Sequence, residues 1–252
     1  MRIAAYYQSM KHPSMSDKYN FVTTEGVVNR FKGLGWSIDS YSQARVRLEH
    51  KEGYQYHRVV MKCEQRQLNV GDSELRLIVS NAHCGTHAVR IYFGLYRKVC
   101  SNGLIIADST FEGLRLRHTA KNIDEQLQNM IDKITIAAET LNSVVISMSG
   151  KTLTGDQALL LARKMLATRF TATQIDACPR MVNDVLALRR QEDAGMDLWS
   201  IYNRIQENLT KGFMSSDWAD GKGRKLKAVT SALKDTTMNV GLWTIAEQQL
   251  VA

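Results

Sequence analysis

The sequence has little proline, few cysteines and no long apolar run. Two prolines and no low-complexity segment in 252 residues exclude a disordered chain or a long flexible linker. No apolar stretch approaches the roughly 18 residues of a membrane span, so we expect no contact with a membrane. The first 20 residues have no apolar core of signal-peptide length, which predicts a cytoplasmic protein.

Cysteine chemistry is equally sparse. In a chain without an export signal we expect the cysteines to be reduced thiols, and none forms a CxxC pair. The cysteines are Cys63, Cys84, Cys100 and Cys178.

Residues 81–87, NAHCGTH, bring zinc-binding residue types together, but their spacing fits no standard zinc finger or ribbon. We therefore expect no metal and interpret this segment as a turn that bends at Gly85.

Motifs of catalysis and cofactor binding are missing as well. The sequence contains no GxSxG, HExxH, Walker lysine loop or GxGxxG. The basic segment 220–225 resembles a phosphate-binding loop only weakly, because it lacks the GKS/T ending. A cysteine nucleophile at Cys84 or Cys100 would need a histidine nearby in space, which sequence does not show. We therefore predict no catalytic residues and no cofactor.

The charge, by contrast, is concentrated in one half of the chain. Residues 1–122 hold 18 Lys and Arg against 10 Asp and Glu, a net charge of +8, whereas residues 123–252 hold 15 of each. All six histidines and eight of the nine tyrosines also lie in the first part. A basic, Tyr- and His-rich half next to a neutral half indicates an anionic partner, with nucleic acid the first candidate.

The same division appears in the periodicity. After a helix predicted at 23–34, apolar residues alternate with polar ones in six segments, which indicates strands with one packed and one solvated face. The predicted strands are 43–49, 56–63, 74–80, 88–99, 104–107 and 113–118.

From residue 123 the apolar spacing becomes helical. It predicts a long helix over 123–148, and then helices over about 154–170, 174–190, 196–211 and 238–250, with Pro179 limiting or splitting the third of these five. The fold class is thus α+β, with an N-terminal antiparallel sheet crossed by the long helix and a helical C-terminal region. We expect a domain of residues 1–150 and a helical region of 151–252.

Arginine and lysine recur on the solvated face of the predicted strands, at Arg58, Lys62 and Arg76 among other positions. Such a row neutralises phosphates without reading base sequence, and tyrosines can stack on unpaired bases. The alternative is a solvated sheet face whose arginines serve solubility and edge protection. The predicted nucleic-acid-binding residues are Arg45, Arg47, Arg90, Tyr92, Tyr96, Arg97, Lys98, Arg115, Arg117 and Lys121.

Several segments resemble the prokaryotic family known as domain of unknown function 932, found in phages, prophages and plasmids. The resembling segments include LIVSNAHCG at 77–85, YRKVCSNGLII at 96–106, RLRHT at 115–119, DLWSIYNRIQENLTK at 197–211 and GLWTIAEQQL at 241–250. This resemblance implies a mobile-element protein in a bacterial host cell and supplies no activity or catalytic residue.

The order of leading helix, strands and long helix is also similar to that of the phage single-strand annealing proteins, the Red-beta, Erf and RecT-like annealases. That resemblance implies a ring or filament of subunits with DNA in a basic groove. The leading hypothesis is therefore a single-stranded DNA-binding protein that promotes annealing and recombination for a phage or plasmid.

Two other functions stay open. One is a regulatory or counter-defence protein that binds a host protein or a nucleotide signal, with affinity that depends weakly on salt. The other is a nuclease or nucleotide-processing enzyme, whose acidic metal ligands we would expect to cluster in the basic half. The acids there are scattered along the sequence.

Overall fold

A computed structural model of the chain describes residues 4–63, 69–70, 73–97, 103–106, 115–215 and 224–251. The fold is α+β, as the sequence predicts, with an N-terminal antiparallel sheet and a largely helical C-terminal half. The chain divides into two compact units, Met1–Thr140 with Ser231–Leu233, and Leu141–Thr230 with Lys234–Ala252. The domain boundary expected after residue 150 stays a prediction.

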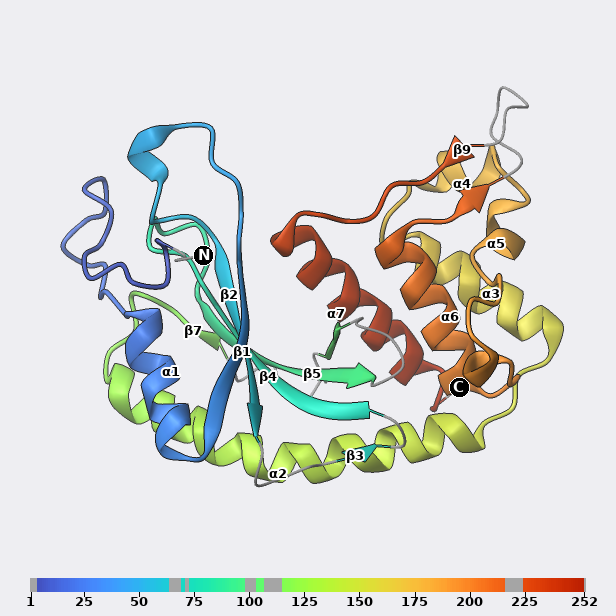
Figure 1. Cartoon of the computed structure of the whole chain (residues 1–252), viewed down its shortest axis with the longest axis horizontal. Helices are drawn as coiled ribbons and strands as arrows, with labels where there is room; N and C mark the ends of the chain where they lie inside the picture. The colour runs from blue at the N-terminus through green and yellow to red at the C-terminus, as the bar shows by residue number, and fades with distance from the viewer. Residues whose placement is uncertain are drawn as a thin grey trace. The chain divides into compact units, whose positions relative to one another are not determined.

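The first unit is built on one antiparallel sheet (Figure 1). Its main path runs β1-β2-β4-β5-β6, with β3 paired to β4 and β7 paired to β5. The strands are β1 Trp36–Gln43, β2 His57–Cys63, β3 Asn69–Val70, β4 Ser73–Asn81, β5 Val89–Arg97, β6 Gly103–Ile106 and β7 Arg115–Leu116.

One face of this sheet is apolar and buried. The alternate residues of β2, β4 and β5 that share this face by register are Val59, Met61, Leu77, Val79, Ile91 and Phe93. Helix α1, Thr24–Gly33, packs against β1 and β4 and buries Val27, Val28 and Phe31. Thr23 caps the helix by accepting a hydrogen bond from the Gly26 backbone N–H.

The long helix α2, Ile123–Gly150, begins beside α1 (Figure 1). Arg30 of α1 forms an ion pair with Asp124 in the first turn of α2, and Leu127, Met130 and Ile131 are buried. The predicted helix 123–148 is therefore confirmed to within two residues. Within the part of the chain that the structure describes, no helix combines the length and apolar character needed to cross a membrane.

The strand predicted at 43–49 is wrong. Strand β1 ends at Gln43, and residues 44–48 form a loop that leads to a short 3-10 helix, Glu49–Lys51. The true first strand begins at Trp36, directly after Gly35, whose φ of 86° suits the turn that ends α1. A register shift between Ile38 and Ser40 interrupts the pairing of β1 with β2, and this bulge breaks the two-residue alternation that a strand otherwise shows.

The remaining strand predictions hold to different degrees. Strands β2, β4 and β5 lie within the predicted ranges or extend them by one residue, and β6 is offset from its predicted range by one residue. Only Arg115–Leu116 of the predicted 113–118 forms a strand, and residues 113–114 lie outside the described ranges. The turn predicted around Gly85 is confirmed, with a φ of 74° at that glycine.

The second unit is mainly helical (Figure 1). Its helices after α2 are α3 Gly155–Leu166, α4 Ala172–Asp176, α5 Met181–Asp184, the 3-10 helix η3 Gln191–Asp193, α6 Leu198–Lys211 and most of α7 Ala232–Gln248. Pro179 lies between α4 and α5, so the predicted helix 174–190 is split there. Helix α7 begins six residues before the predicted start at 238. Strands β8 Met214–Ser215 and β9 Arg224–Lys225 form a short antiparallel pair.

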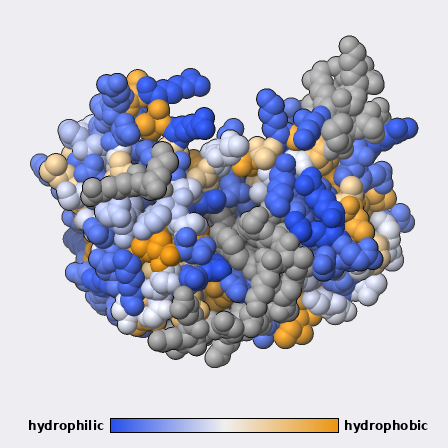
Figure 2. Space-filling view, in the orientation of Figure 1, coloured by the Kyte–Doolittle hydropathy of each residue, from blue (hydrophilic) through white to orange (hydrophobic). Residues whose placement is uncertain are grey.

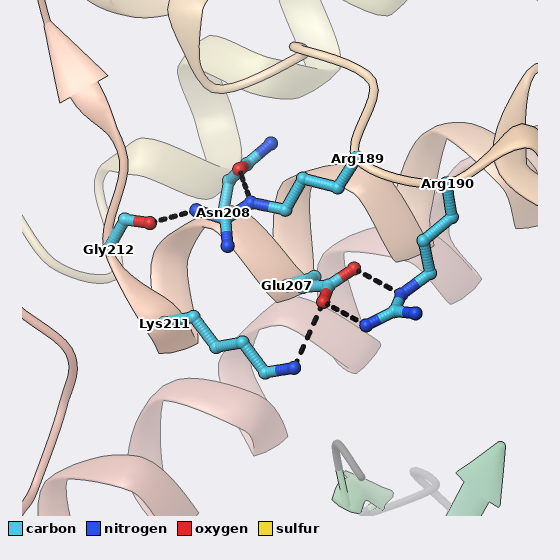
Figure 3. Close-up of polar contacts among 6 residues, drawn as sticks. All are labelled: Arg189, Arg190, Glu207, Asn208, Lys211 and Gly212. Carbon is cyan, nitrogen blue, oxygen red and sulfur yellow. Dashed lines mark hydrogen bonds and ion pairs between the residues drawn. The ribbon is translucent and has the colours of Figure 1, made fainter. Parts of the chain in front are cut away.

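Polar side chains hold the segment before α6 against that helix (Figure 3). Glu207, almost fully buried, accepts hydrogen bonds from Arg190 at 2.9 and 3.0 Å and from Lys211 at 3.1 Å. Asn208 donates to the carbonyl oxygens of Val185 and Ala187 at 2.8 and 2.9 Å. These bonds satisfy the buried polar groups of Glu207 and Asn208.

Candidate nucleic-acid interface

The second face of the sheet carries most of the strand arginines. Strand register places Ser42, Arg58, Ser80, Arg90 and Arg115 opposite one another in a single row across β1, β2, β4, β5 and β7. Neighbouring strands lie about 4.8 Å apart, so Arg90 and Arg115 are direct neighbours and Arg58 is two strands away from Arg90. We call this set the arginine row.

A second basic pair lies farther along the same face. Lys62 of β2 is opposite Arg76 of β4, four residues from the arginine row along each strand. Between the two lies a row formed by Val60, Ile78 and Tyr92. An aromatic ring thus sits between two groups of cations, an arrangement suited to a base flanked by phosphates.

The cations of this face differ in their partners. Arg76 is paired with Glu74 at 2.7 Å and with Asp39 at 3.5 Å, so two carboxylates offset its charge. Arg58 donates from Nε to the Ser42 hydroxyl at 2.8 Å, and Arg90 donates to the Tyr92 hydroxyl at 3.3 Å. Arg76 is therefore a weaker candidate for a phosphate contact than the exposed Arg90 and Arg115.

The centre of this face is buried, whereas its edge along β5 and β7 is accessible. Val60 and Ile78 are buried although they lie on the polar face, whereas Arg90 and Arg115 are exposed and Tyr92 is half-buried. Arg117 and Lys121, which follow β7, are exposed too. A ligand can thus reach the edge along β5, β7 and residues 117–121 more easily than the centre of the face.

The structure brings together some of the predicted binding residues and separates others. Arg90, Tyr92 and Arg115 share the polar face, and Arg117 follows two residues after Arg115. Arg45 and Arg47 are exposed in the loop after β1, not on a strand, because the strand predicted there is absent. Tyr96 and Arg97 lie in β5, opposite Glu74 and Ser73. Lys98 lies outside the described residues.

A buried polar network lies at the end of the sheet next to the arginine row. The Asn81 amide donates to the Val22 carbonyl oxygen at 3.0 Å and to the Thr24 hydroxyl at 3.1 Å, and its oxygen accepts from the Ala82 N–H at 2.8 Å. The Thr24 hydroxyl donates to His57 Nε2 at 2.6 Å, and His57 Nδ1–H donates to the Gln55 carbonyl oxygen at 2.9 Å. Each donor in this chain meets an acceptor, which fixes the tautomer of His57.

His118 joins the network from the segment after β7. Its Nε2–H donates to the Asn81 oxygen at 3.0 Å, while Nδ1 lies 3.2 Å from the Asn20 carbonyl oxygen. Its ring stacks on Tyr19 with centroids 4.5 Å apart. Burial lowers the pKa of His118, and the carbonyl oxygens of Asn20 and His87 oppose that shift.

The sequence analysis missed this network, interpreting residues 81–87 only as a turn. The available signal was that Asn81, His83 and His118 all lie in the segments LIVSNAHCG and RLRHT, which carry the family resemblance. Side chains that join residues 20, 81 and 118 become visible only once the strands are paired.

The hydroxyl and imidazole of Thr24 and His57 have the spacing of a nucleophile and its base, but both side chains are fully buried. Cys84, the described one of the two candidate nucleophiles, lies 3.3 Å from the Thr86 hydroxyl. Across the described ranges, no group of three or more His, Cys, Asp or Glu residues has the arrangement of a metal site. The polar network therefore holds the N-terminal residues on the sheet, and the arginine row is the better candidate for a binding surface.

Fold and surface together define an α+β protein with a basic antiparallel sheet and a helical second unit. The chain belongs to the family described as "Domain of unknown function (DUF932)", whose profile matches residues 11–237. The match covers both units, in agreement with the resemblance found in the sequence.

Two relatives come from Escherichia coli (strain K12). The chain is 28% identical to "UPF0380 protein YfjQ" over 248 residues, and 28% identical to "UPF0380 protein YafZ" over 254 residues. In each case the alignment covers 98% of this chain and 88% of the relative. No solved structure shows a significant match to the chain.

Proposed function

We propose that this protein binds single-stranded DNA along the arginine row and promotes the annealing of complementary strands for a phage or plasmid. The observation that carries the proposal is the register, which sets Arg58, Arg90 and Arg115 in one line on one face. Arg90 and Arg115 would bind phosphates, and the half-buried Tyr92 would stack on a base.

The surface supports a polar rather than an apolar partner. In Figure 2, among the residues drawn in colour, apolar side chains form small separate patches and hydrophilic ones cover most of the face in view. Annealing needs neither a catalytic base nor a metal. It needs neutralised phosphates and exposed base edges, and several subunits that present one continuous groove would help two strands meet. The proposal therefore includes assembly of several copies of the chain.

The test replaces the two adjacent cations of the arginine row. We expect Arg90→Ala combined with Arg115→Ala to weaken binding of a single-stranded oligonucleotide and to slow annealing. Because each phosphate contact on a single strand contributes about 0.7 to the salt slope, loss of two contacts reduces that slope by about 1.4. Fluorescence anisotropy over a salt series measures the slope, and pairing of labelled complementary strands in the same samples measures annealing.

A matched control removes the same charge elsewhere. Lys133→Ala combined with Lys164→Ala changes two exposed cations on α2 and α3 and should leave affinity and salt slope unchanged. Equal binding by the folded Arg90 and Arg115 variant would exclude this face as the site. Failure of the unaltered protein to bind any strand at low salt would exclude the function itself and favour a protein partner. Tight binding without faster annealing would retain the binding site and reject the annealing step.

A further inference from the structure

A separate groove lies between α1, the residues just before it and the start of α2. Its volume is about 420 Å³, at the lower end of the roughly 300–1,000 Å³ that small-molecule sites occupy. Its lining includes Phe21, Val27, Arg30, Ile123, Asp124 and Leu127. None of them belongs to the arginine row, so the groove is a second candidate site in the first unit.

Hydrogen bonds and ring packing to neighbouring residues fix the segment 20–22 that lines the groove. The Val22 carbonyl oxygen accepts a hydrogen bond from the Asn81 amide at 3.0 Å, and the Asn20 amide donates to the Ala120 carbonyl oxygen at 2.8 Å. Phe21 packs against His83 with ring centroids 4.9 Å apart. A ligand would thus meet a wall that is already ordered, which lowers the entropic cost of binding.

The chemistry of the lining is that of a slot for a flat ring with a polar edge. The half-buried Phe21 and Ile123 supply apolar contact, whereas Val27 and Leu127, also in the lining, are almost fully buried. The lining also has two charged groups, and they stand side by side, because Arg30 donates to one carboxylate oxygen of Asp124. The Asp124 side chain is 86% exposed, so its carboxylate stays open to a ligand.

A guanidinium beside a carboxylate offers donors and acceptors on one edge. Guanine has the complementary edge, because N1–H and N2–H donate to a carboxylate while O6 and N7 accept from arginine. Adenine has an amino group at that edge but no ring N–H beside it, so it can give the carboxylate only part of this pairing.

We propose that this groove binds a purine base and prefers guanine, with Phe21 as the stacking surface and Asp124 and Arg30 reading the base edge. The base belongs either to a free nucleotide or to a strand of nucleic acid. This site does not depend on the arginine row, which is assigned to phosphates.

The experiment titrates the whole chain with guanosine monophosphate and with adenosine monophosphate, up to millimolar concentration, and follows resonances of the groove by NMR. We expect shifts at Phe21 and Leu127 and tighter binding of the guanine nucleotide. Asp124→Asn removes the carboxylate acceptor and should weaken guanosine monophosphate binding about tenfold or more while changing adenosine monophosphate binding little. The Arg30–Asp124 pair is exposed, so this variant should fold normally.

The control is Glu125→Gln, which removes the neighbouring exposed carboxylate outside the lining and should keep the guanine preference. Absence of shifts in the groove with both nucleotides would overturn the proposal, and so would an unchanged preference in Asp124→Asn. Ile123→Trp, which fills the groove, provides a second variant that should abolish binding.

Two further experiments distinguish a free nucleotide from a nucleic-acid strand as the source of the base, and binding at the groove from binding at the arginine row. An oligothymidylate carrying one guanine should compete with guanosine monophosphate if the base comes from a strand, and should not compete if only free nucleotides enter. The variant with Arg90→Ala and Arg115→Ala should retain nucleotide binding. Nucleotide binding without strand binding would therefore reject only the proposed DNA function, and strand binding without nucleotide binding would reject only the groove.

Discussion

Histidine acts in this sheet as a buried, neutral hydrogen-bonding group. His57 and His83 are fully buried, and their rings lie 5.0 Å apart. His83 Nε2–H donates to the Ala5 carbonyl oxygen at 3.0 Å. Burial lowers the pKa of His57 to about 4, and burial together with the neighbouring His57 lowers the pKa of His83 to about 3.

These low pKa values predict that the protein loses stability in mild acid. The unfolded histidines titrate near 6.5, so below that pH the unfolded chain binds protons that the folded chain does not. The free energy of unfolding should therefore fall as the pH drops from about 6.5 to about 4, and it should be constant in this respect above that range. Urea unfolding at a series of pH values measures the slope.

His57→Gln tests the assignment of this pH dependence. The variant removes one titrating group, so its free energy of unfolding should fall less steeply with acid than that of the unaltered chain. His50→Gln changes an exposed histidine and should keep the original slope. An identical slope in both variants would show that another group is responsible.

At the scale of single elements, α6 depends on arginines that bind its flanking segments. Arg169 donates to the carbonyl oxygen of Leu209 near the helix end, and Arg204 donates to the carbonyl oxygens of Asp193 and Gly195. Together with Arg189 and Arg190, these side chains are occupied within the second unit. They hold loops on the helix, and this use fits the neutral charge of that half of the chain.

Among these contacts, we expect loss of the buried Glu207 carboxylate to destabilise the fold most (Figure 3). Replacing it by Gln keeps the volume but leaves the positive charges of Arg190 and Lys211 without their shared carboxylate. We expect the free energy of unfolding to fall by about 3 kcal/mol, the lower end for a broken buried pair, because both cations are partly exposed. Urea unfolding followed by circular dichroism gives the value.

The control for this element is the exposed pair of Arg163 and Asp176, whose side chains are 50% and 59% accessible. Arg163→Ala should cost no more than about 1 kcal/mol, because water screens a surface pair. A similar loss in both variants would contradict the role given to burial.

The helices and strands that the sequence located well are those whose pattern is set by one uninterrupted face. Strand β4 and helices α2 and α6 follow their apolar periodicity closely. The sequence missed strand β1 because its bulge breaks the alternation, whereas residues 44–49 continue an alternating pattern but form no strand. Helix α7 begins early because Ala232 is buried against Tyr56 and Ala82, a tertiary contact that no local pattern contains.

The sequence predicted which types of residue form the candidate site, but not how these residues are arranged across the strands. Alternation places Arg90 and Tyr92 on one face of β5, which the sequence alone can indicate. It cannot give the neighbours of a strand, and so it misses the line that joins Arg58, Arg90 and Arg115. Alternation also cannot show that Asp39 and Glu74 offset the charge of Arg76, because the ion pairs depend on the strand register.

For the whole molecule, the separation of charge predicts where DNA makes contact. The excess of 8 positive charges lies within residues 1–122, and the remainder is neutral. Hydrogen exchange with and without a single-stranded oligonucleotide should therefore slow in β5 and in residues 115–121, with no change in α3 or α6. Protection confined to the second unit would contradict the assignment of the site to the sheet.

The hydrogen bonds that hold residues 5–20 on the sheet determine when this segment can fold during synthesis. Ala5 is bonded to His83, 78 positions later, and Asn20 to His118, 98 positions later. Residues 5–20 therefore leave the ribosome well before these partners and wait until most of the sheet has been made. Contacts so distant along the chain close slowly, so this segment completes the fold instead of starting it.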